Sequence, residues 1–261
     1  MRESKPTIGY VNAYLSHGPP IRPLAEEVPL SLSFNGISHA VMMVTPHDLT
    51  AFIHGFSYSE GITSSKGEIK DIQFVHYDEG IEAQIELSNR SFYRLKEQKR
   101  NLAGRTGCGL CGKESLEQIM MDLARLRGSP LPSITSLYNL RERLYSEQTF
   151  AQVSGGLHSA ALCSQSGEIV LNFEDVGRHN ALDKLIGATL MENHDIQSSF
   201  VVLTSRCSYE LIQKVVKLVC PTLITLSAPT TKALGLAKHY NVNLLHYTPQ
   251  QNVLVYHQSV P

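Results

Sequence analysis

The sequence predicts an α/β protein: a C-terminal three-layer α/β/α domain with a mostly parallel sheet, and a smaller N-terminal α+β domain. In the last hundred residues, continuous apolar runs typical of buried strands alternate with helical patterns. The first hundred residues show strand patterns around one long helix. Prolines at 130 and 132 mark a boundary. We therefore expect a strand-rich domain over 1–100, a cysteine-containing loop and linker over 101–132, and an α/β domain over 133–261.

The N-terminal elements follow from local patterns. Residues 28–34 alternate apolar and polar side chains, as a half-buried strand does. Thr45-Pro46 predicts a helix start, with Thr45 as N-cap, and the helix is expected to end near Glu60-Gly61. Residues 72–77 and 81–87 flank a turn signal and predict a hairpin.

The rest of the chain is read in the same way. The Gly-rich stretch 101–112 lacks periodicity and predicts a mobile loop, and Ser133 can cap a helix to about Glu147. Later elements are expected as strands at 159–164, 168–173, 200–204, 222–226 and 242–245, with helices from about Arg178, Ser208 and Pro229. Sheets of this kind bind ligands outside the carboxyl ends of their strands.

Composition is that of an ordinary globular protein, with 42% hydrophobic residues and a mean hydropathy of -0.11. A net charge of -1 gives no case for nucleic acid. We find no apolar run long enough for a membrane span and no signal peptide, so we expect a cytoplasmic protein. Five cysteines without a pairing pattern argue against a disulfide framework, and Cys163 and Cys220 read as buried core residues.

Charge is unevenly distributed. Between Arg90 and Lys113 there are seven cations and one anion, a net of six positive charges. Such a run is often only a solvated face. Because this one leads directly into a pair of cysteines, we expect it to dock an acidic donor surface or a phosphate-rich cofactor.

Cys108 and Cys111 lie in that basic stretch, between Arg105 and Lys113. Four glycines surround them: Gly104, Gly107, Gly109 and Gly112. Nearby cations lower the pKa of a thiol, and the thiolate is the nucleophile. Glycines allow the backbone to turn and a partner to approach closely. The pattern predicts an exposed loop whose cysteine carries sulfur.

Three other interpretations of Cys-x-x-Cys stay open. A zinc site needs four ligands, and only His158, His179 or Cys207 could complete one through the fold. A thioredoxin-like dithiol usually lies at a strand-to-helix turn, which this stretch does not resemble. A chance pair of structural thiols is the third. We predict no metal site.

The motifs occur in a fixed order along the chain. They are Glu27-Val28-Pro29, Thr45-Pro46, Ser59-Glu60-Gly61-Ile62, Gly107-Cys108-Gly109-Leu110-Cys111-Gly112-Lys113, Gly155-Gly156-Leu157-His158-Ser159-Ala160-Ala161-Leu162, the run Glu174-Asp175-Val176-Gly177-Arg178-His179-Asn180-Ala181-Leu182-Asp183-Lys184, Ser205-Arg206-Cys207-Ser208-Tyr209-Glu210 and Ser227-Ala228-Pro229-Thr230-Thr231. Together they resemble the formate dehydrogenase accessory sulfurtransferase family, FdhD, over nearly the whole chain.

The resemblance implies a sulfurtransferase. Its first cysteine, here Cys108, would take a persulfide from a cysteine desulfurase and pass sulfur to the molybdenum bis-molybdopterin guanine dinucleotide cofactor, which activates formate dehydrogenase. Cys111 would assist the transfer or resolve the persulfide. A homodimer is implied as well. A dithiol redox enzyme and a non-catalytic cofactor chaperone are the alternative functions.

The resemblance also implies that the C-terminal domain is cytidine-deaminase-like. Zinc deaminases need His-x-Glu and Pro-Cys-x-x-Cys. Here the matching stretches read His179-Asn180-Ala181 and Ser205-Arg206-Cys207-Ser208, which lack the glutamate and the second cysteine. Deamination is therefore excluded.

What remains of that pocket suits an anion. Arg178 and Arg206 lie at predicted helix starts, where free backbone N–H groups can hold phosphate. Several residues have two interpretations: Ser227 and Thr230 as caps or ligand contacts, Asp175 as a cap or a guanine partner, and His158 and His179 as core or pocket residues. The candidate cofactor-binding residues of this group are Asp175, Arg178, His179, Ser205, Arg206, Ser227 and Thr230.

A C-terminal segment completes the candidate cofactor site. The matching stretch of the family commonly starts with an aromatic residue and contains arginines, which are absent here. Phosphate contacts would then come from backbone N–H groups, from Gln250 and Gln251, or from arginines elsewhere in the chain. The candidates are Tyr247, Thr248, Pro249, Gln250, Gln251 and Asn252.

Overall fold

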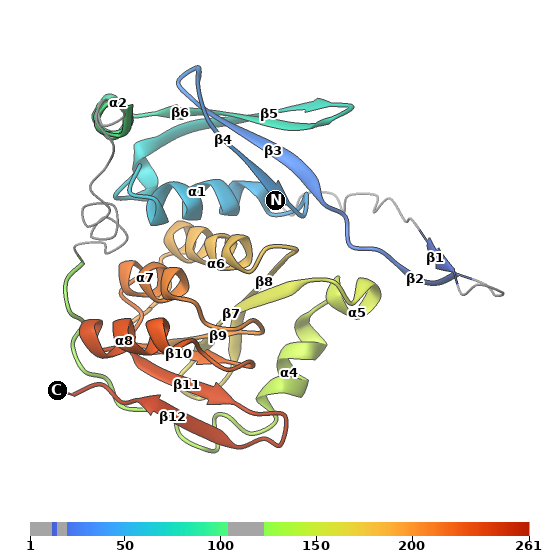
Figure 1. The fold of residues 1–261 in the computed structure, drawn as a ribbon, viewed down its shortest axis with the longest axis vertical. Coiled ribbons are helices and arrows are strands. Elements are labelled where there is room, and N and C mark those ends of the chain that lie inside the picture. Colours follow the sequence, from blue (N-terminus) through green and yellow to red (C-terminus); the bar gives the residue numbers. More distant parts are fainter. Residues whose placement is uncertain (1–11, 15–19, 104–122, 261) are drawn as a thin grey trace.

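The computed structural model describes residues 12–14, 20–103 and 123–260 of the 261-residue chain. Two large sheets lie one above the other with helices between them, and a two-stranded arm extends to one side (Figure 1). The first part contains β1 (Asn12–Tyr14), β2 (Pro20–Pro23), β3 (Val28–Phe34), β4 (Ile37–Val44), α1 (Leu49–Ser59), η1 (Lys66–Glu68), β5 (Ile69–Tyr77), β6 (Gly80–Leu87) and α2 (Asn89–Ala103). The second contains α4 (Leu140–Glu147), α5 (Ala151–Ser154), β7 (His158–Ser164), β8 (Ile169–Asp175), α6 (Arg178–Glu192), β9 (Ser199–Leu203), α7 (Tyr209–Lys217), β10 (Thr222–Thr225), α8 (Thr231–Tyr240), β11 (Asn243–Tyr247) and β12 (Val253–His257).

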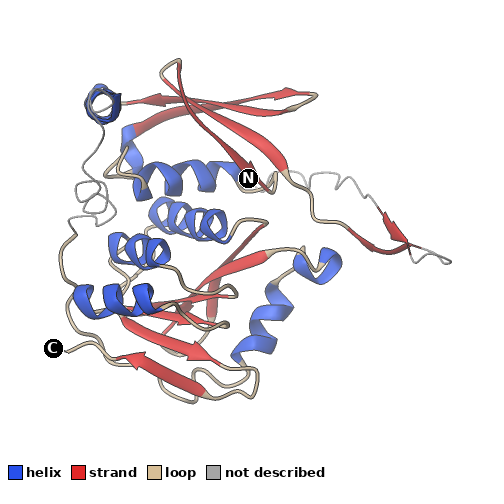
Figure 2. Cartoon of the chain, in the orientation of Figure 1, coloured by secondary structure: helices blue, strands red, loops and turns tan. Residues whose placement is uncertain are grey.

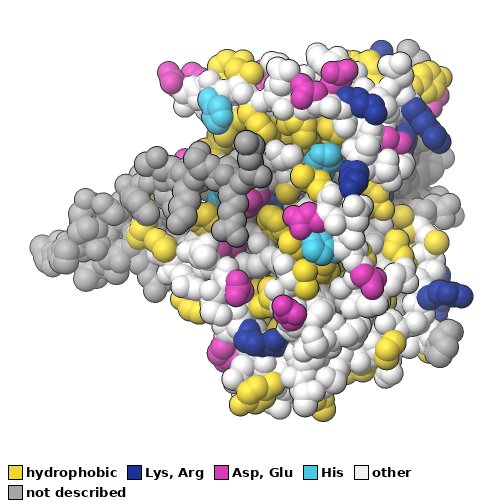
Figure 3. Space-filling view, turned by 180° about the vertical axis from the view of Figure 1, so that it is seen from behind, with side chains coloured by type: hydrophobic (Ala, Val, Ile, Leu, Met, Phe, Trp, Pro, Cys, Tyr) yellow, Lys and Arg dark blue, Asp and Glu magenta, His cyan; other side chains and the backbone are white. Residues whose placement is uncertain are grey.

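The four-stranded sheet has the order β4-β3-β6-β5 and covers α1. Burial alternates along β6, as expected for a sheet with one buried face. Leu30 and Leu32 of β3 pack on Phe52 and Phe56 of α1 in one hydrophobic core. Seen from behind, basic side chains gather at the upper right, where α2 lies (Figure 3).

The six-stranded sheet has the order β12-β11-β10-β9-β7-β8. Only the β9–β10 and β10–β11 pairs are parallel, and the other three pairs are antiparallel. The prediction of a mostly parallel sheet is therefore wrong. The strand β7 forms a hairpin with β8 and also lies antiparallel to β9, and β12 returns beside β11 after a tight turn. Short connections of this kind can join antiparallel strands, whereas parallel strands need a longer crossover.

Helices cover both faces of this sheet (Figure 2). One hydrophobic core joins its upper face to α6, α7 and α8, and another joins its lower face to α4. The cytidine-deaminase-like character and the division at residues 100 and 132 stay predictions.

The two parts meet where α1 crosses α6. A Cβ atom added to Gly55 would lie 1.7 Å from the carbonyl oxygen of Asp183, and one added to Gly187 would lie 1.8 Å from that of Ala51. The two backbones are thus in direct contact, which only glycine allows. This crossing ties the N-terminal sheet to the C-terminal layers.

Several predicted boundaries need correction. The helix expected at Thr45-Pro46 starts at Leu49, with Asp48 and not Thr45 as its N-cap. The helix expected from Ser133 starts at Leu140, after a series of turns. The first hundred residues contain a second long helix, α2, and the strands β4 and β12 were not predicted. The expected mobile loop at 101–112 falls almost entirely outside the described residues, and its first three residues belong to α2.

Candidate functional site

The topology brings most of the sequence motifs to one edge of the six-stranded sheet. The strands β8, β9, β10 and β11 run in the same direction, and β7 runs oppositely between β8 and β9. Their carboxyl ends therefore meet along one edge, together with the start of β7. We call this line of strand ends and following residues the carboxyl edge. It includes Asp175, Ser205, Ser227 and Thr248.

Asp175 ends β8 and is fully buried. Its Oδ1 accepts hydrogen bonds from the Gly177 backbone N–H (2.8 Å) and the Asn180 side chain (2.9 Å). Its Oδ2 accepts one from the Thr45 backbone N–H (3.1 Å) and lies 2.8 Å from Lys184 Nζ. Both oxygens are engaged inside the protein, so neither predicted role, guanine partner or N-cap, holds. The carboxylate instead ties the β4–α1 turn to the start of α6.

Lys184 completes this buried junction. Its ammonium also donates to the backbone carbonyls of Thr45 and Glu174, each at 3.1 Å. Burial lowers the pKa of Lys184, while the charge of Asp175 opposes that shift. Removing either partner would leave the other charge buried and unpaired.

Two helix starts at the carboxyl edge keep polar atoms without partners. Arg178 is the first residue of α6, and its Nε is buried with no hydrogen-bond partner among the described residues. Ser208 is the N-cap of α7, yet its Oγ is buried and makes no cap bond. Arg206 beside it is exposed. Buried polar atoms are normally paired, so these atoms and the first N–H groups of both helices offer a place for an anion.

His179 lies beside this candidate anion site and pairs with a glutamate of α7. Its Nε2 is 2.8 Å from Glu210 Oε2 on α7, with the two side chains 31% and 46% exposed. Burial lowers the pKa of His179, and the charges of Arg178 and Lys214 add to that effect against Glu210. At neutral pH we therefore expect a neutral imidazole, suited to hydrogen bonding.

His158 starts β7 at the same edge. Burial and the charge of Arg178 lower the pKa of His158, although Asp175 opposes the shift. The charge of Arg178 thus acts on both histidines and favours their neutral forms. Neither histidine is a fully buried core residue.

A cleft of about 350 Å³ adjoins His179 between α1, α6 and α7. Met42 and Phe56 form apolar parts of its lining, and Glu60 and Glu210 form acidic parts. At its floor, Lys214 Nζ lies 2.9 Å from each oxygen of Asp183. This volume is that of a small-molecule site.

The side-chain hydroxyl groups at the carboxyl edge form hydrogen bonds with backbone groups of the protein itself. Thr230 Oγ1 accepts from the Ala233 backbone N–H (3.2 Å), so Thr230 caps α8. Ser227 Oγ donates to the Thr204 carbonyl (3.2 Å) and joins the exits of β9 and β10. Ser205 is buried, and its Oγ donates to the Arg206 carbonyl (3.1 Å). The alternative of capping is thus realised for Thr230.

The segment after β11 forms the turn to β12. Tyr247, a predicted cofactor-binding residue, is 1% exposed, and its side chain lies in the core beside α4. Thr248 holds the turn, because its backbone N–H donates to the Asn252 carbonyl (2.9 Å) and its Oγ1 accepts from the Asn252 N–H (3.1 Å). Pro249 and Gln250 are exposed, and Gln251 lies 3.4 Å from Glu142.

An arginine that no sequence motif contains, Arg141, reaches the carboxyl edge from the lower face of the sheet. Arg141 on α4 donates through Nη2 to the carbonyls of Leu226 (3.0 Å) and Tyr247 (3.2 Å), where β10 and β11 end. Its Nε is buried without a partner among the described residues. The sequence offers no local signal for this role, because it depends on how α4 packs under the sheet.

The three described cysteines are unsuited to nucleophilic chemistry. Cys163, Cys207 and Cys220 are fully buried free thiols. Burial raises the pKa of Cys163 and of Cys207 to about 12 and that of Cys220 to about 11. The prediction of buried core thiols at 163 and 220 is confirmed. Cys108 and Cys111 lie outside the described residues.

Over 12–14, 20–103 and 123–260, no three His, Cys, Asp or Glu side chains gather as metal ligands. No helix of that part of the chain is both long and apolar enough to cross a membrane.

The fold and the edge define the class: a two-sheet α/β protein with a candidate anion site where helices start at the carboxyl ends of its strands. The profile of the FdhD/NarQ family matches residues 25–260, and the chain belongs to this family.

Relatives in this family are similar along most of their length. Proteins named sulfur carrier protein FdhD from Variovorax paradoxus and Cupriavidus necator are 41% and 43% identical over 233 residues, covering 89% of this chain and 84% and 81% of theirs. A crystal structure of a protein assigned as a formate dehydrogenase accessory protein, from Desulfotalea psychrophila, matches with a TM-score of 0.70 over 92% of this chain and 90% of the other, at 22% identity. That likeness concerns the fold.

Proposed function

We propose that this chain is a sulfur carrier that accepts a persulfide on Cys108 from a cysteine desulfurase and passes sulfur to the molybdenum bis-molybdopterin guanine dinucleotide cofactor for formate dehydrogenase. The relatives' printed name, sulfur carrier protein, supports the class. The observation that carries the assignment to Cys108 or Cys111 is the burial of the other three thiols. With pKa values of about 11 to 12, those three are protonated at neutral pH.

The loading step conserves atoms and electrons. The Cys108 thiolate attacks the outer sulfur of the desulfurase persulfide, a new S–S bond forms, and the desulfurase cysteine leaves as a thiolate. The cation-rich flanks of Cys108 favour its thiolate. Cys111 follows Cys108 by three residues in the sequence and would assist the transfer or resolve an unused persulfide.

The cofactor enters this proposal as the substrate that receives sulfur. Its guanine dinucleotides carry phosphates, and the carboxyl edge offers Arg178, Arg206 and the N-terminal N–H groups of α6 and α7. Arg178 Nε and Ser208 Oγ are buried without a partner in the part of the chain that the structure describes, which supports a phosphate there. The cleft of about 350 Å³ beside His179 would take an adjoining part.

Mass spectrometry tests the carrier. The protein is incubated with a desulfurase and cysteine, and the peptide with Cys108 is analysed. Added sulfur on Cys108 supports the proposal, and a Cys108→Ala variant should then take up none. An intramolecular disulfide would favour a dithiol redox enzyme, and an unchanged mass a non-catalytic cofactor chaperone.

A homodimer and a cytoplasmic location belong to the same proposal. Sulfur carriage needs a reduced Cys108 before loading, which the cytoplasm provides. Analytical ultracentrifugation of the full chain tests the dimer.

A further inference from the structure

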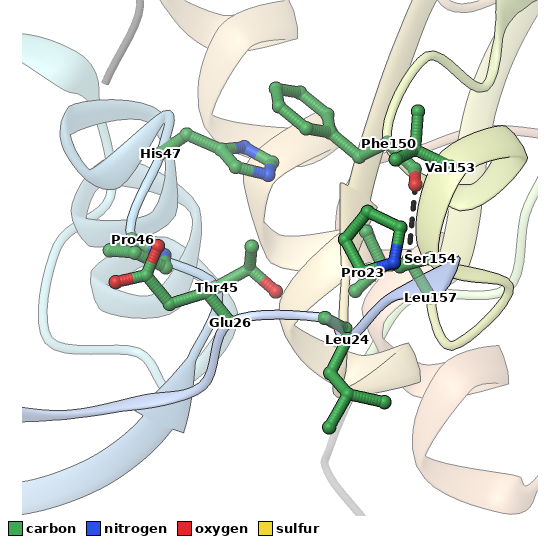
Figure 4. Close-up of a pocket in the computed structure, with 11 residues that line it drawn as sticks. Pro23, Leu24, Glu26, Thr45, Pro46, His47, Phe150, Val153, Ser154 and Leu157 are labelled. Carbon is green, nitrogen blue, oxygen red and sulfur yellow. Dashed lines mark hydrogen bonds between the residues drawn. The ribbon is translucent and has the colours of Figure 1, made fainter. Parts of the chain in front are cut away.

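A second hollow lies away from the helix starts that the proposed function uses. Three separate stretches line it: residues 23–26 after β2, residues 45–47 before α1, and the α5 region from 150 to 157 (Figure 4). Most of these side chains are apolar. A water-sized group can move within about 30 Å³ of it, and the hollow measures about 430 Å³ with its open mouth. It is thus a narrow apolar slot.

His47 has its ring aimed into the slot, whose other polar lining residues are Glu26, Thr45 and Ser154. Its side chain is only 9% exposed, and its ring stacks on Phe150 with centroids 4.1 Å apart and planes 13° apart. Figure 4 shows the ring turned toward Phe150 and Pro23. Its Nε2 is buried without a hydrogen-bond partner among the described residues. A buried nitrogen of this kind is expected to have one.

Asp48 orients that imidazole. Its Oδ2 lies 2.9 Å from His47 Nδ1, and because a carboxylate only accepts, Nδ1 donates. In the neutral imidazole, the other nitrogen, Nε2, then has its lone pair free. Burial would raise the pKa of Asp48, but the hydrogen bond from His47, the charge that His47 carries when protonated and the charge of Lys184 outweigh it, so the pKa is lowered and the carboxylate is ionised at neutral pH.

The local backbone is strained in keeping with this arrangement. Asp48 has φ 55° and ψ 32°, in the left-handed region, and it caps α1 without a side-chain cap bond. Its carboxylate serves His47 instead. Such strained residues gather at functional sites.

The opposite wall is also held in place. The Glu174 carboxylate accepts from the backbone N–H groups of Phe150 (3.0 Å) and Ala151 (2.7 Å). Thr45, at the edge of the slot, is held by Asp175. The slot is therefore formed before any ligand arrives, which lowers the entropy cost of binding.

We propose that this slot binds a phenol, whose hydroxyl donates a hydrogen bond to His47 Nε2 and whose ring lies among the apolar side chains. A mostly apolar lining disfavours a charged ligand, and a hydroxyl group can donate to the buried nitrogen of the neutral His47 ring. A narrow slot suits a ring that carries its donor at the tip, as phenol does, whereas indole carries its N–H on the side of a wider ring.

The phenol can come from a free small molecule or from a tyrosine side chain of another protein. Leu24 and Val153 line the slot and are 50% and 42% exposed. A tyrosine within a polypeptide would bring flanking residues onto these two side chains, and a free phenol would leave them in water.

Solution NMR of the full chain tests the site with two probes, p-cresol and 4-methylanisole, which differ in the donor. Methyl signals of Val153 and Leu157 should shift on binding, and p-cresol should bind about tenfold more tightly, as one hydrogen bond allows. In His47→Phe, which keeps the stack on Phe150, the ratio should fall to about one. Equal binding of the two probes to the unaltered protein, or no shift of these methyls up to the solubility limit of p-cresol, overturns the proposal even if the variant does not fold.

The source of the phenol is settled by a short peptide, Gly-Leu-Tyr-Leu-Gly. If a protein tyrosine is the ligand, the peptide binds more tightly than p-cresol, and Leu24→Ser with Val153→Ser removes that gain while p-cresol still binds. If a free phenol is the ligand, p-cresol binds at least as tightly as the peptide. Failure of both probes to bind contradicts the site itself.

Discussion

The α1–α6 junction and the carboxyl edge both bury polar groups, but they treat them differently. At the junction, Asp175 pairs with Lys184 and Asp183 pairs with Lys214, and hydrogen bonds satisfy the remaining atoms of these carboxylates. At the edge, Arg178 Nε and Ser208 Oγ are buried without partners in the described structure. The carboxylates of the junction find their partners within the protein, whereas the carboxyl edge leaves polar atoms that a bound ligand would pair.

The largest expected effect breaks the junction. In Gly55→Ala, the new Cβ would lie 1.7 Å from the Asp183 carbonyl oxygen, so α1 and α6 must separate. We expect a loss of about 3 kcal/mol or more in the free energy of unfolding, measured by urea titration. Gly235→Ala on α8 is the matched control, because no atom lies within 4 Å of its added Cβ, and it should stabilise by up to about 1 kcal/mol. Equal losses in the two variants would show that close helix contact is not the cause.

The second largest expected effect tests whether the carboxyl edge binds phosphate. Arg178→Gln should weaken binding of GDP about tenfold by calorimetry, because a charge-assisted phosphate contact is lost. It should change the free energy of unfolding by less than about 0.5 kcal/mol. Arg127→Gln, an exposed arginine at the opposite edge of the sheet, should leave both quantities unchanged. A similar loss of GDP binding in both variants would contradict a specific phosphate site.

A pH effect at the junction comes next. Burial, with the charges of Lys214 and Arg94, lowers the pKa of Lys217 to about 8. Between about pH 8 and 10.5 the unfolded chain binds this proton and the folded one does not, so stability rises with pH in that window. Because the ammonium keeps partial access to water, we expect a gain of about 1 kcal/mol. The free energy of unfolding of Lys217→Met should lack this gain over the same pH range. Parallel pH curves for the variant and the unaltered protein would contradict the prediction.

The smallest effect compares two helix starts. Thr230→Ala should cost about 1 kcal/mol, because Thr230 Oγ1 accepts from the Ala233 N–H. Ser208→Ala should cost nothing or stabilise slightly, because its Oγ makes no cap bond. Thermal unfolding of both variants decides this. If Ser208→Ala were as costly as Thr230→Ala, the edge would be structural rather than open to a ligand.

The sequence predicted the elements of the C-terminal half well where local patterns suffice. The apolar run before Thr204 and the polar and apolar spacing after Arg178 correspond to β9 and α6 within a residue or so. Cys163 and Cys220 were recognised as core residues because they lie in apolar runs. Strand direction was predicted less well, since pairing partners are distant in sequence and the alternation of strand with helix does not specify them.

The candidate site shows the same division. Arg178 and the start of α6 were predicted from the motif, and the structure places them at the carboxyl edge. Asp175 and Tyr247 were expected to meet a ligand, but both are buried. Arg141 was not predicted at all, although it holds the ends of β10 and β11.

By itself the sequence determined the periodic elements, the chemical character of the motifs and the family resemblance, because these depend on residues close together in the chain. Only the tertiary structure decided which polar groups form hydrogen bonds inside the protein and which remain available to a ligand. The Thr45–Asp175 contact joins residues 130 positions apart. Whether such a carboxylate faces a ligand or a buried backbone depends on long-range packing, which no local pattern encodes.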